Sequence, residues 1–197
     1  MDMIFEWTIP SKKENELKRL IGHKILSMVK TSYETFQEHL NYLDEVGEID
    51  YRDRLSFFKY SYGGLLIFFD NDTEYYFGSA EDLNSVIMGC QKNINGKYNE
   101  NYILDDKDVL DKTSVSDFFD NDFKKILNQK IRLINILTTN NLNGKEQCVP
   151  SEKGIEFIFE NNKKLILSHN LTENSFVFAV LTERDKISLN TIIKKMI

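Results

Sequence analysis

Two copies of one 25-residue pattern occur in this chain, and the repeat limits the folds that the chain can adopt. Residues 64–88 read GLLIFFDNDTEYYFGSAEDLNSVIM, and residues 154–178 read GIEFIFENNKKLILSHNLTENSFVF, aligned without a gap. Nine of the 25 pairs exchange one large apolar residue for another and five are identical, where chance gives about one or two. The identical pairs are Gly64/Gly154, Phe69/Phe159, Asn71/Asn161, Asn84/Asn174 and Ser85/Ser175. Such internal similarity indicates a duplicated structural unit.

A further match extends the repeat toward the start of each half. Residues 17–25 correspond to residues 123–131, at an offset of 106 rather than 90. The difference of 16 residues predicts an insertion in the first half at about 31–54, where YETFQEHLNYL has helical spacing and an acidic loop follows. We expect a first half at 1–98, an acidic connector at 99–122 and a second half at 123–197, in one compact unit.

The apolar spacing of the other segments predicts short helices and antiparallel strands. Strands are expected at 3–9, 23–29, 55–62, 130–139 and 176–181, hairpins at 65–77 and 154–168, helices at 11–22 and 122–127, and a helix or edge strand at 187–197. Asp and Asn in both hairpin turns favour tight connections, and Ser116 or Asp120 is placed to cap the second helix. The predicted fold class is α+β and β-rich, with duplicated helix–strand–hairpin units forming antiparallel sheets flanked by a few helices.

The faces of the two hairpins differ in polarity. Residues 65–69 are apolar on both faces, which predicts strands covered on both sides. In the second hairpin Glu156 and Glu160 alternate with apolar residues, which predicts one face open to water. The aromatic residues Phe58, Tyr60 and Tyr62 are expected on one face of the strand at 55–62, where core packing is favoured over stacking on bases.

Composition argues for a protein partner rather than a nucleic acid. The net charge is −6 and the pI is about 5.2, whereas phosphate binding needs clustered Lys and Arg. No apolar run is long enough for a bilayer and no signal peptide is present, so we expect a cytoplasmic protein without a membrane partner. Cys90 and Cys148 are then expected as reduced thiols rather than a disulfide.

No local catalytic signature is present. The chain has neither a phosphate-binding loop nor an H-E-x-x-H or G-x-S-x-G motif, and His23, His39 and His169 lie in separate segments. We therefore expect no catalytic, cofactor-binding or metal-binding residues, and no enzyme. Cys90 or a histidine beside a carboxylate between the repeats is the enzymatic alternative.

Acidic residues concentrate in the two segments that lie outside the repeat. Residues 99–122 hold eight acidic and two basic residues. Loops on a rigid scaffold commonly carry binding, and a negative surface attracts a cationic partner. The expected partner-binding residues are Asp44, Glu45, Glu48, Asp50, Asp53, Asp105, Asp106, Asp108 and Asp111.

The paired hairpins resemble those of bacterial immunity proteins from polymorphic-toxin and contact-dependent growth inhibition systems. The residues that carry the resemblance in the first copy are Leu66, Phe68, Asp70, Asn71 and 84–86. Those in the second copy are Ile158, Glu160, Asn161 and 174–176. It implies a non-enzymatic inhibitor that binds a cognate toxin, often a nuclease, inside the cell that makes it. The expected partner is thus a basic toxin whose active site the acidic loops cover. A structural or regulatory module that assembles through its second sheet is the other alternative.

Asn84-Ser85 and Asn174-Ser175 stand at the entry to a strand in both copies. Asn and Ser side chains bond readily to nearby backbone groups, which predicts a turn or capping role. A ligand bound at the axis that relates the repeats is the alternative.

Overall fold

The computed structural model describes residues 7–90, 108–118, 120–139, 149–171, 178–183, 185, 187 and 192–197, with the backbone alone at 90, 192 and 193. Its strands are β1 (Ile25–Ser32), β2 (Leu65–Phe69), β3 (Glu74–Ala80), β4 (Ser85–Cys90), β5 (Asp111–Ser114), β6 (Ile131–Thr139), β7 (Glu152–Phe159), β8 (Lys164–Ser168), β9 (Ala179–Thr182) and β10 (Ile192–Met196). Its α-helices are α1 (Glu14–Arg19), α2 (Phe36–Glu45), α3 (Arg54–Tyr60) and α4 (Asn121–Ile126).

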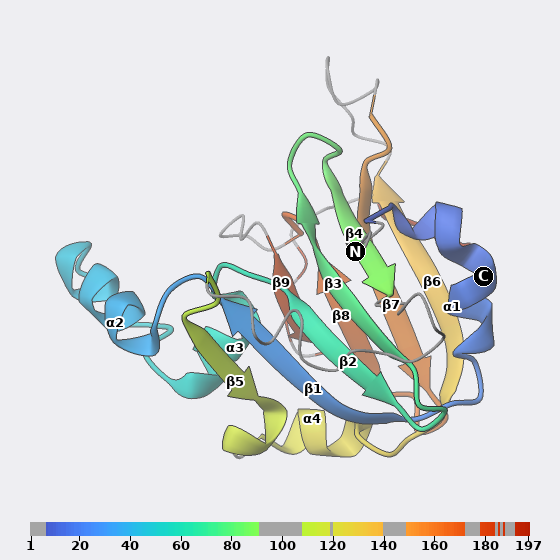
Figure 1. Cartoon of the computed structure of the whole chain (residues 1–197), viewed down its shortest axis with the longest axis horizontal. Coiled ribbons are helices and arrows are strands. Elements are labelled where there is room, and N and C mark those ends of the chain that lie inside the picture. Colours follow the sequence, from blue (N-terminus) through green and yellow to red (C-terminus); the bar gives the residue numbers. More distant parts are fainter. Residues whose placement is uncertain are drawn as a thin grey trace, which may run out of the picture.

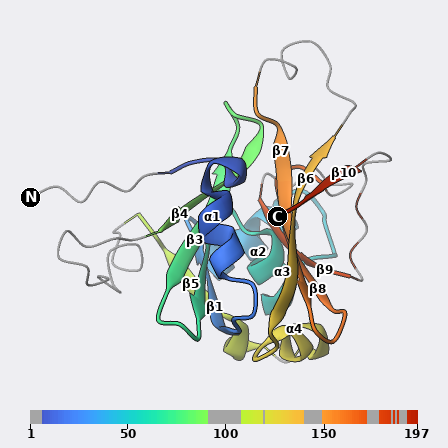
Figure 2. The same cartoon turned by 90° about the vertical axis from the view of Figure 1, so that its right-hand side faces the viewer.

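The strands form two antiparallel five-stranded sheets that face each other (Figures 1 and 2). The first has the order β4-β3-β2-β1-β5 and the second the order β10-β6-β7-β8-β9. Written from the other edge, the second sheet is β9-β8-β7-β6-β10. Strands β6 to β9 therefore correspond to β1 to β4, and β10 corresponds to β5. The α+β, strand-rich class predicted from the sequence is therefore confirmed.

The two sheets also share their register. Ile25 pairs with Phe69 and is followed by a bulge, and Ile131 pairs with Phe159 and is followed by a bulge at the same place. Offsets of 106 and 90 convert the first pair into the second, as the repeat in the sequence requires. A bulge retained at one position in two sheets indicates a shared structural unit.

Corresponding residues of the two halves meet along an approximate twofold axis. Lys24 forms an isolated bridge with Lys130, its own counterpart at the offset of 106. Two hydrogen bonds related by the same offset accompany it, from Gly22 N to Ile131 O (2.7 Å) and from Asn128 N to Ile25 O (2.9 Å). Both donors have a positive φ, which glycine and asparagine tolerate best.

One hydrophobic core fills the space between the sheets. It includes Ile67 and Phe77 from the first sheet and Phe157 from the second, and the rings of Phe77 and Phe157 meet edge to face at 6.1 Å. Helices α1 and α4, which correspond in the repeat, lie beside the gap between the sheets in Figure 2 and add Leu17 and Phe123 to this core.

The prediction of a strand at 55–62 is wrong, because residues 54–60 form α3. Asp53 caps this helix by accepting a 2.7 Å hydrogen bond from Ser56 N. Phe57 packs against α2 through His39, and Phe58 packs against Phe123 in the main core. Phe57 and Phe58 are adjacent in the sequence but pack in different directions, against α2 and against the main core. The expected aromatic face of a strand therefore does not form.

The prediction of a wet face on the second hairpin is also wrong at Glu156, which is only 1% exposed. Its carboxylate accepts hydrogen bonds from Asn135 at 2.6 Å and from Lys194 on β10 at 2.7 Å, and Lys164 approaches to 3.2 Å. These donors hold the pKa of Glu156 below its usual value although burial acts in the opposite direction. The glutamate therefore fastens the edge strand β10 to the sheet.

Several expected segments extend into parts of the chain that the structure leaves undescribed. The described part of the predicted N-terminal strand is a bridge between Thr8 and Met88. The acidic connector contains β5, which pairs with β1, while 99–107 lie outside the described residues. The last segment forms the edge strand β10 rather than a helix. Cys148 and the side chain of Cys90 also lie outside the described residues.

Candidate functional site

The insertion predicted at 31–54 forms an arm, residues 36–53, that projects from the body of the protein (Figure 1). Its helix α2 begins with a capping box, in which Thr35 and Glu38 satisfy each other's backbone N–H groups. The inner side of α2 buries His39 and Leu43, and His39 meets the Phe57 ring of α3 at 5.2 Å. The other side of the helix faces solvent.

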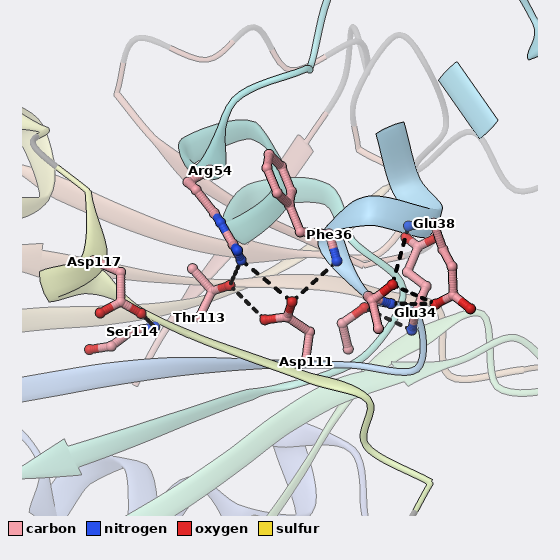
Figure 3. Close-up of polar contacts among 10 residues, drawn as sticks. Glu34, Phe36, Glu38, Arg54, Asp111, Thr113, Ser114 and Asp117 are labelled. Atoms are coloured by element: carbon pink, nitrogen blue, oxygen red, sulfur yellow. Dashed lines mark hydrogen bonds and ion pairs between the residues drawn. The ribbon is translucent and has the colours of Figure 1, made fainter. Parts of the chain in front are cut away.

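Asp111 fixes the base of the arm (Figure 3). Its carboxylate accepts hydrogen bonds from the backbone N–H of Phe36 at 3.1 Å and from Arg54 at 3.4 Å. The Arg54 guanidinium also lies 4.2 Å from the centre of the Phe36 ring. Thr113 donates to the second carboxylate oxygen at 3.2 Å. One aspartate on β5 thereby joins the starts of α2 and α3.

A buried histidine, His39, supports the same region. His39 Nδ1 lies 3.5 Å from the Glu34 carboxylate, and its Nε2 lies 3.2 Å from the backbone oxygen of Tyr51. The hydrogen bond to Glu34 raises the pKa of His39 despite partial burial. Since the raised pKa belongs to the folded state, this contact stabilises the arm fully below the unfolded pKa and is lost as pH rises through the folded pKa.

The outer surface of the arm combines large apolar and acidic side chains. Tyr42 is 58% exposed, Val46 56% and Ile49 83%. Residues 41–53 carry five carboxylates and one arginine, a net charge of −4. Isolated exposed apolar residues are common on proteins, but three within eight residues on a projecting element form a candidate contact surface.

The predicted partner-binding residues divide into structural and exposed groups. Asp53 caps α3, Asp111 holds the arm, and Asp44 pairs with Arg52 at 2.5 Å, which lowers the pKa of Asp44. Asp44 and Asp53 are nevertheless exposed, and the other exposed carboxylates on the arm and beside β5 are Glu45, Asp50 and Asp108. Glu48, half-exposed, accepts from Asp50 N at 3.0 Å. Asp105 and Asp106 lie outside the described residues.

A second group of polar residues, the polar joint, connects the two halves and comprises Ser79, Asn84, Ser85, Ser151, Glu152, Lys153 and His169. His169 is 1% exposed and bonds through Nδ1 to the Ser79 hydroxyl. Its Nε2 lies 3.1 Å from Asn84 Oδ1, which also accepts from Lys153 Nζ. Ser79 and His169 are counterparts at the offset of 90, so they too lie across the approximate twofold axis.

The polar joint changes the interpretation of Asn84 and Ser85. Ser85 donates locally to Leu83 O at 2.8 Å, as a turn role predicts, but its Oγ also accepts from Glu152 N at 2.8 Å. Asn84 has a φ of 50° and donates through its side chain to Ser151 at 3.2 Å. Both residues therefore fasten the two sheets together. Asn174 and Ser175, their counterparts, lie outside the described residues.

No protein-family model, curated protein or solved structure matches the chain. Among the described helices none has the length and apolar character needed to cross a membrane. Within the same described residues, no group of three or more His, Cys, Asp or Glu side chains is arranged to hold a metal ion.

Proposed function

We propose that the protein is an immunity protein that binds a basic cognate toxin in the cytoplasm and covers its active site with the acidic arm. The observation that carries the proposal is the exposed apolar and acidic surface of α2 and the loop after it, residues 42–50. This surface lies in one of the two segments that are outside the repeat. The resemblance of the hairpins to those of bacterial immunity proteins supports the same class of function.

The chemistry of the arm suits a cationic protein surface. Apolar side chains at the centre of an interface supply most of the binding free energy, while surrounding charges steer association and select the partner. Tyr42, Val46 and Ile49 provide the apolar centre, and Glu45 and Asp50 provide exposed charge next to it. A nuclease has a basic site for phosphate, so it fits this description as a partner.

Charge reversal on the arm tests the proposal. We expect Glu45→Lys with Asp50→Lys to weaken binding to the toxin by roughly 10- to 100-fold and to reduce its dependence on salt. Both side chains are exposed, so the fold should be unaffected. The measurement is the Kd at two salt concentrations for the protein encoded by the gene directly upstream, together with rescue of growth in cells that express that protein.

The matched control reverses two charges elsewhere on the molecule. Glu160 and Glu183 are exposed residues that follow β7 and β9 in the second sheet. Glu160→Lys with Glu183→Lys changes the net charge by the same amount and should leave toxin binding within about twofold, because distant charges are largely screened. Equal loss of affinity in both variants would show that the arm is not the contact surface.

An enzyme with a site between the repeats is the second candidate, and the contact between Ser79 and His169 favours it. Lys153 can only donate, so Asn84 Oδ1 accepts from it and can also accept from His169 Nε2, whereas the amide nitrogen of Asn170 lies 3.2 Å from the same Nε2 and can only donate. In the tautomer that carries its hydrogen on Nε2, the Nδ1 atom of His169 accepts from the Ser79 hydroxyl. A serine held against such a base is the arrangement used in acyl transfer.

A fluorophosphonate probe distinguishes this candidate from the inhibitor. If Ser79 is a nucleophile, its oxygen displaces fluoride from the probe, the proton passes to His169, and the peptide that contains Ser79 gains the mass of the phosphonyl group. The label should disappear in both Ser79→Ala and His169→Gln. An unlabelled wild-type protein after prolonged incubation would leave the polar joint with a structural role.

A further inference from the structure

A pocket of about 470 Å³ lies at the end of the first sheet that adjoins the arm. Tyr33, which precedes α2, and Tyr62, which follows α3, line one part of it. Trp7 and Tyr76 also line it, as do Glu81 and Asp82 from the turn between β3 and β4. The pocket thus begins where the arm leaves the body.

The aromatic side chains are arranged as two pairs. The Trp7 and Tyr76 rings meet edge to face at 5.0 Å, and those of Tyr33 and Tyr62 lie 5.8 Å apart. Tyr76 is buried, and its hydroxyl makes a 2.8 Å hydrogen bond with Thr31 Oγ1. Trp7, Tyr33 and Tyr62 are 40%, 46% and 61% exposed, so much of their ring surface is open to a ligand.

Charge and aromatic character favour the same class of ligand. Glu81 and Asp82 are exposed carboxylates, and among the described residues that line the pocket none is a lysine or an arginine. Aromatic ring faces attract cations through their quadrupole, and carboxylates attract them directly. Since no lysine or arginine is among these lining residues, the two carboxylates favour a cation over an anion.

We propose that this pocket receives an arginine side chain of the basic protein that the arm binds. The guanidinium group is planar, stacks on aromatic rings and pairs with carboxylates, which matches each part of the lining. The pocket is also large enough for a group of that size. This inference rests on the proposed function for the identity of the partner, whereas the cation preference of the pocket is a separate property.

The pocket contains its own optical reporter. Trp7 is the only tryptophan in the chain, so fluorescence excited at wavelengths that tyrosine does not absorb reports on this pocket. The experiment titrates the full chain with N-acetyl-arginine amide and, separately, with N-acetyl-citrulline amide at constant ionic strength. Citrulline has nearly the same shape as arginine but no charge. We expect a saturable change with the arginine compound and binding roughly tenfold weaker with the citrulline compound.

Two variants complete the test. Glu81→Gln with Asp82→Asn keeps the shape of the pocket and should reduce arginine binding several-fold. The control variant Glu160→Lys with Glu183→Lys should bind the arginine compound as wild type does. Equal binding of both compounds, or a response that does not saturate, would overturn the proposal. If the protein binds the arginine compound but not the toxin, only the proposed function is contradicted. If it binds the toxin equally well with and without Glu81→Gln and Asp82→Asn, and does not respond to the arginine compound, only the proposal for the pocket is contradicted.

Discussion

Replacing Lys30 by methionine is expected to raise the free energy of unfolding by roughly 3 kcal/mol at pH 7. Lys30 is 1% exposed on β1, where its strand neighbours are Leu65 and Thr113. Its Nζ has no hydrogen-bond partner among the described residues and lies 4.5 Å from the centre of the Phe178 ring. Burial lowers the pKa of Lys30 to about 7, and the aromatic ring offsets only part of the cost of desolvation.

The effect should depend on pH in a defined direction. In the unfolded chain Lys30 keeps its proton up to about pH 10.5, whereas in the folded protein it loses the proton above about pH 7. Between these values the unfolded state binds more protons, so the stability of the wild type rises with pH. Lys30→Met removes this contribution, and its advantage should be complete below pH 7 and shrink toward pH 10.

Urea unfolding at pH 6.5, 8 and 9.5 measures the difference. Lys112→Met is the matched control, because Lys112 is an exposed lysine on the adjacent strand β5 and its replacement should change stability by less than about 0.5 kcal/mol at each pH. A Lys30→Met protein that is less stable than the wild type would show that Lys30 has a stabilising partner. A gain that is constant with pH would show that Lys30 stays charged.

The duplication allowed much of the fold to be predicted, because turn chemistry and apolar spacing act locally. Asp72 and Asn162 occupy corresponding positions of the two hairpin turns with φ of 57° and 63°, and both residue types tolerate that conformation. The sequence therefore predicted both hairpins at the right place. Strand order between the sheets follows from the repeat, once one half is known.

Where the prediction failed, two readings of the same residues compete. The run LSFFKYSY at 55–62 alternates in polarity like a strand, but Asp53, two residues before it, is suited to cap a helix. The tertiary contacts of Phe57 and Phe58 decide in favour of the helix. Propensity and spacing give weak preferences over only seven residues. Glu156 shows a related limit, since its partner Lys194 lies 38 residues away in the sequence.

The candidate site was predictable in outline but not residue by residue. Composition located the acidic insertion, yet it did not separate Asp53 and Asp111, which hold the structure, from Glu45 and Asp50, which face solvent. The contact between Ser79 and His169 did carry a signal. Ser79 and His169 occupy the same position in the two copies of the repeat. Residues close to a twofold axis contact the equivalent residue of the other copy, and Lys24 and Lys130 do the same.

Gly64 and Gly154 occupy the same position of the two repeats, but each must be a glycine for a different structural reason. A Cβ on Gly64 would lie 2.1 Å from the Cζ and Oη atoms of Tyr76, whereas a Cβ on Gly154 would lie 2.7 Å from the backbone oxygen of Leu167. In the first half, glycine is needed so that the Tyr76 ring can cross β2 and reach Thr31. In the second, glycine allows close approach of two strands.

Gly64→Ala is therefore expected to lower the free energy of unfolding by roughly 2–3 kcal/mol, because the Tyr76 ring must leave its place. Gly78→Ala is the matched control, since a Cβ there has no neighbour closer than 3.9 Å, and its effect should stay within about 1 kcal/mol. In a Tyr76→Ala background Gly64→Ala should cost almost nothing further, a coupling that a double-mutant cycle measures. Since Trp7 contacts Tyr76, Gly64→Ala should also shift the fluorescence of Trp7. If Gly64→Ala and Gly78→Ala lower the free energy of unfolding equally, and Gly64→Ala shows no coupling to Tyr76, the glycine is required by the strand backbone and not by the Tyr76 ring.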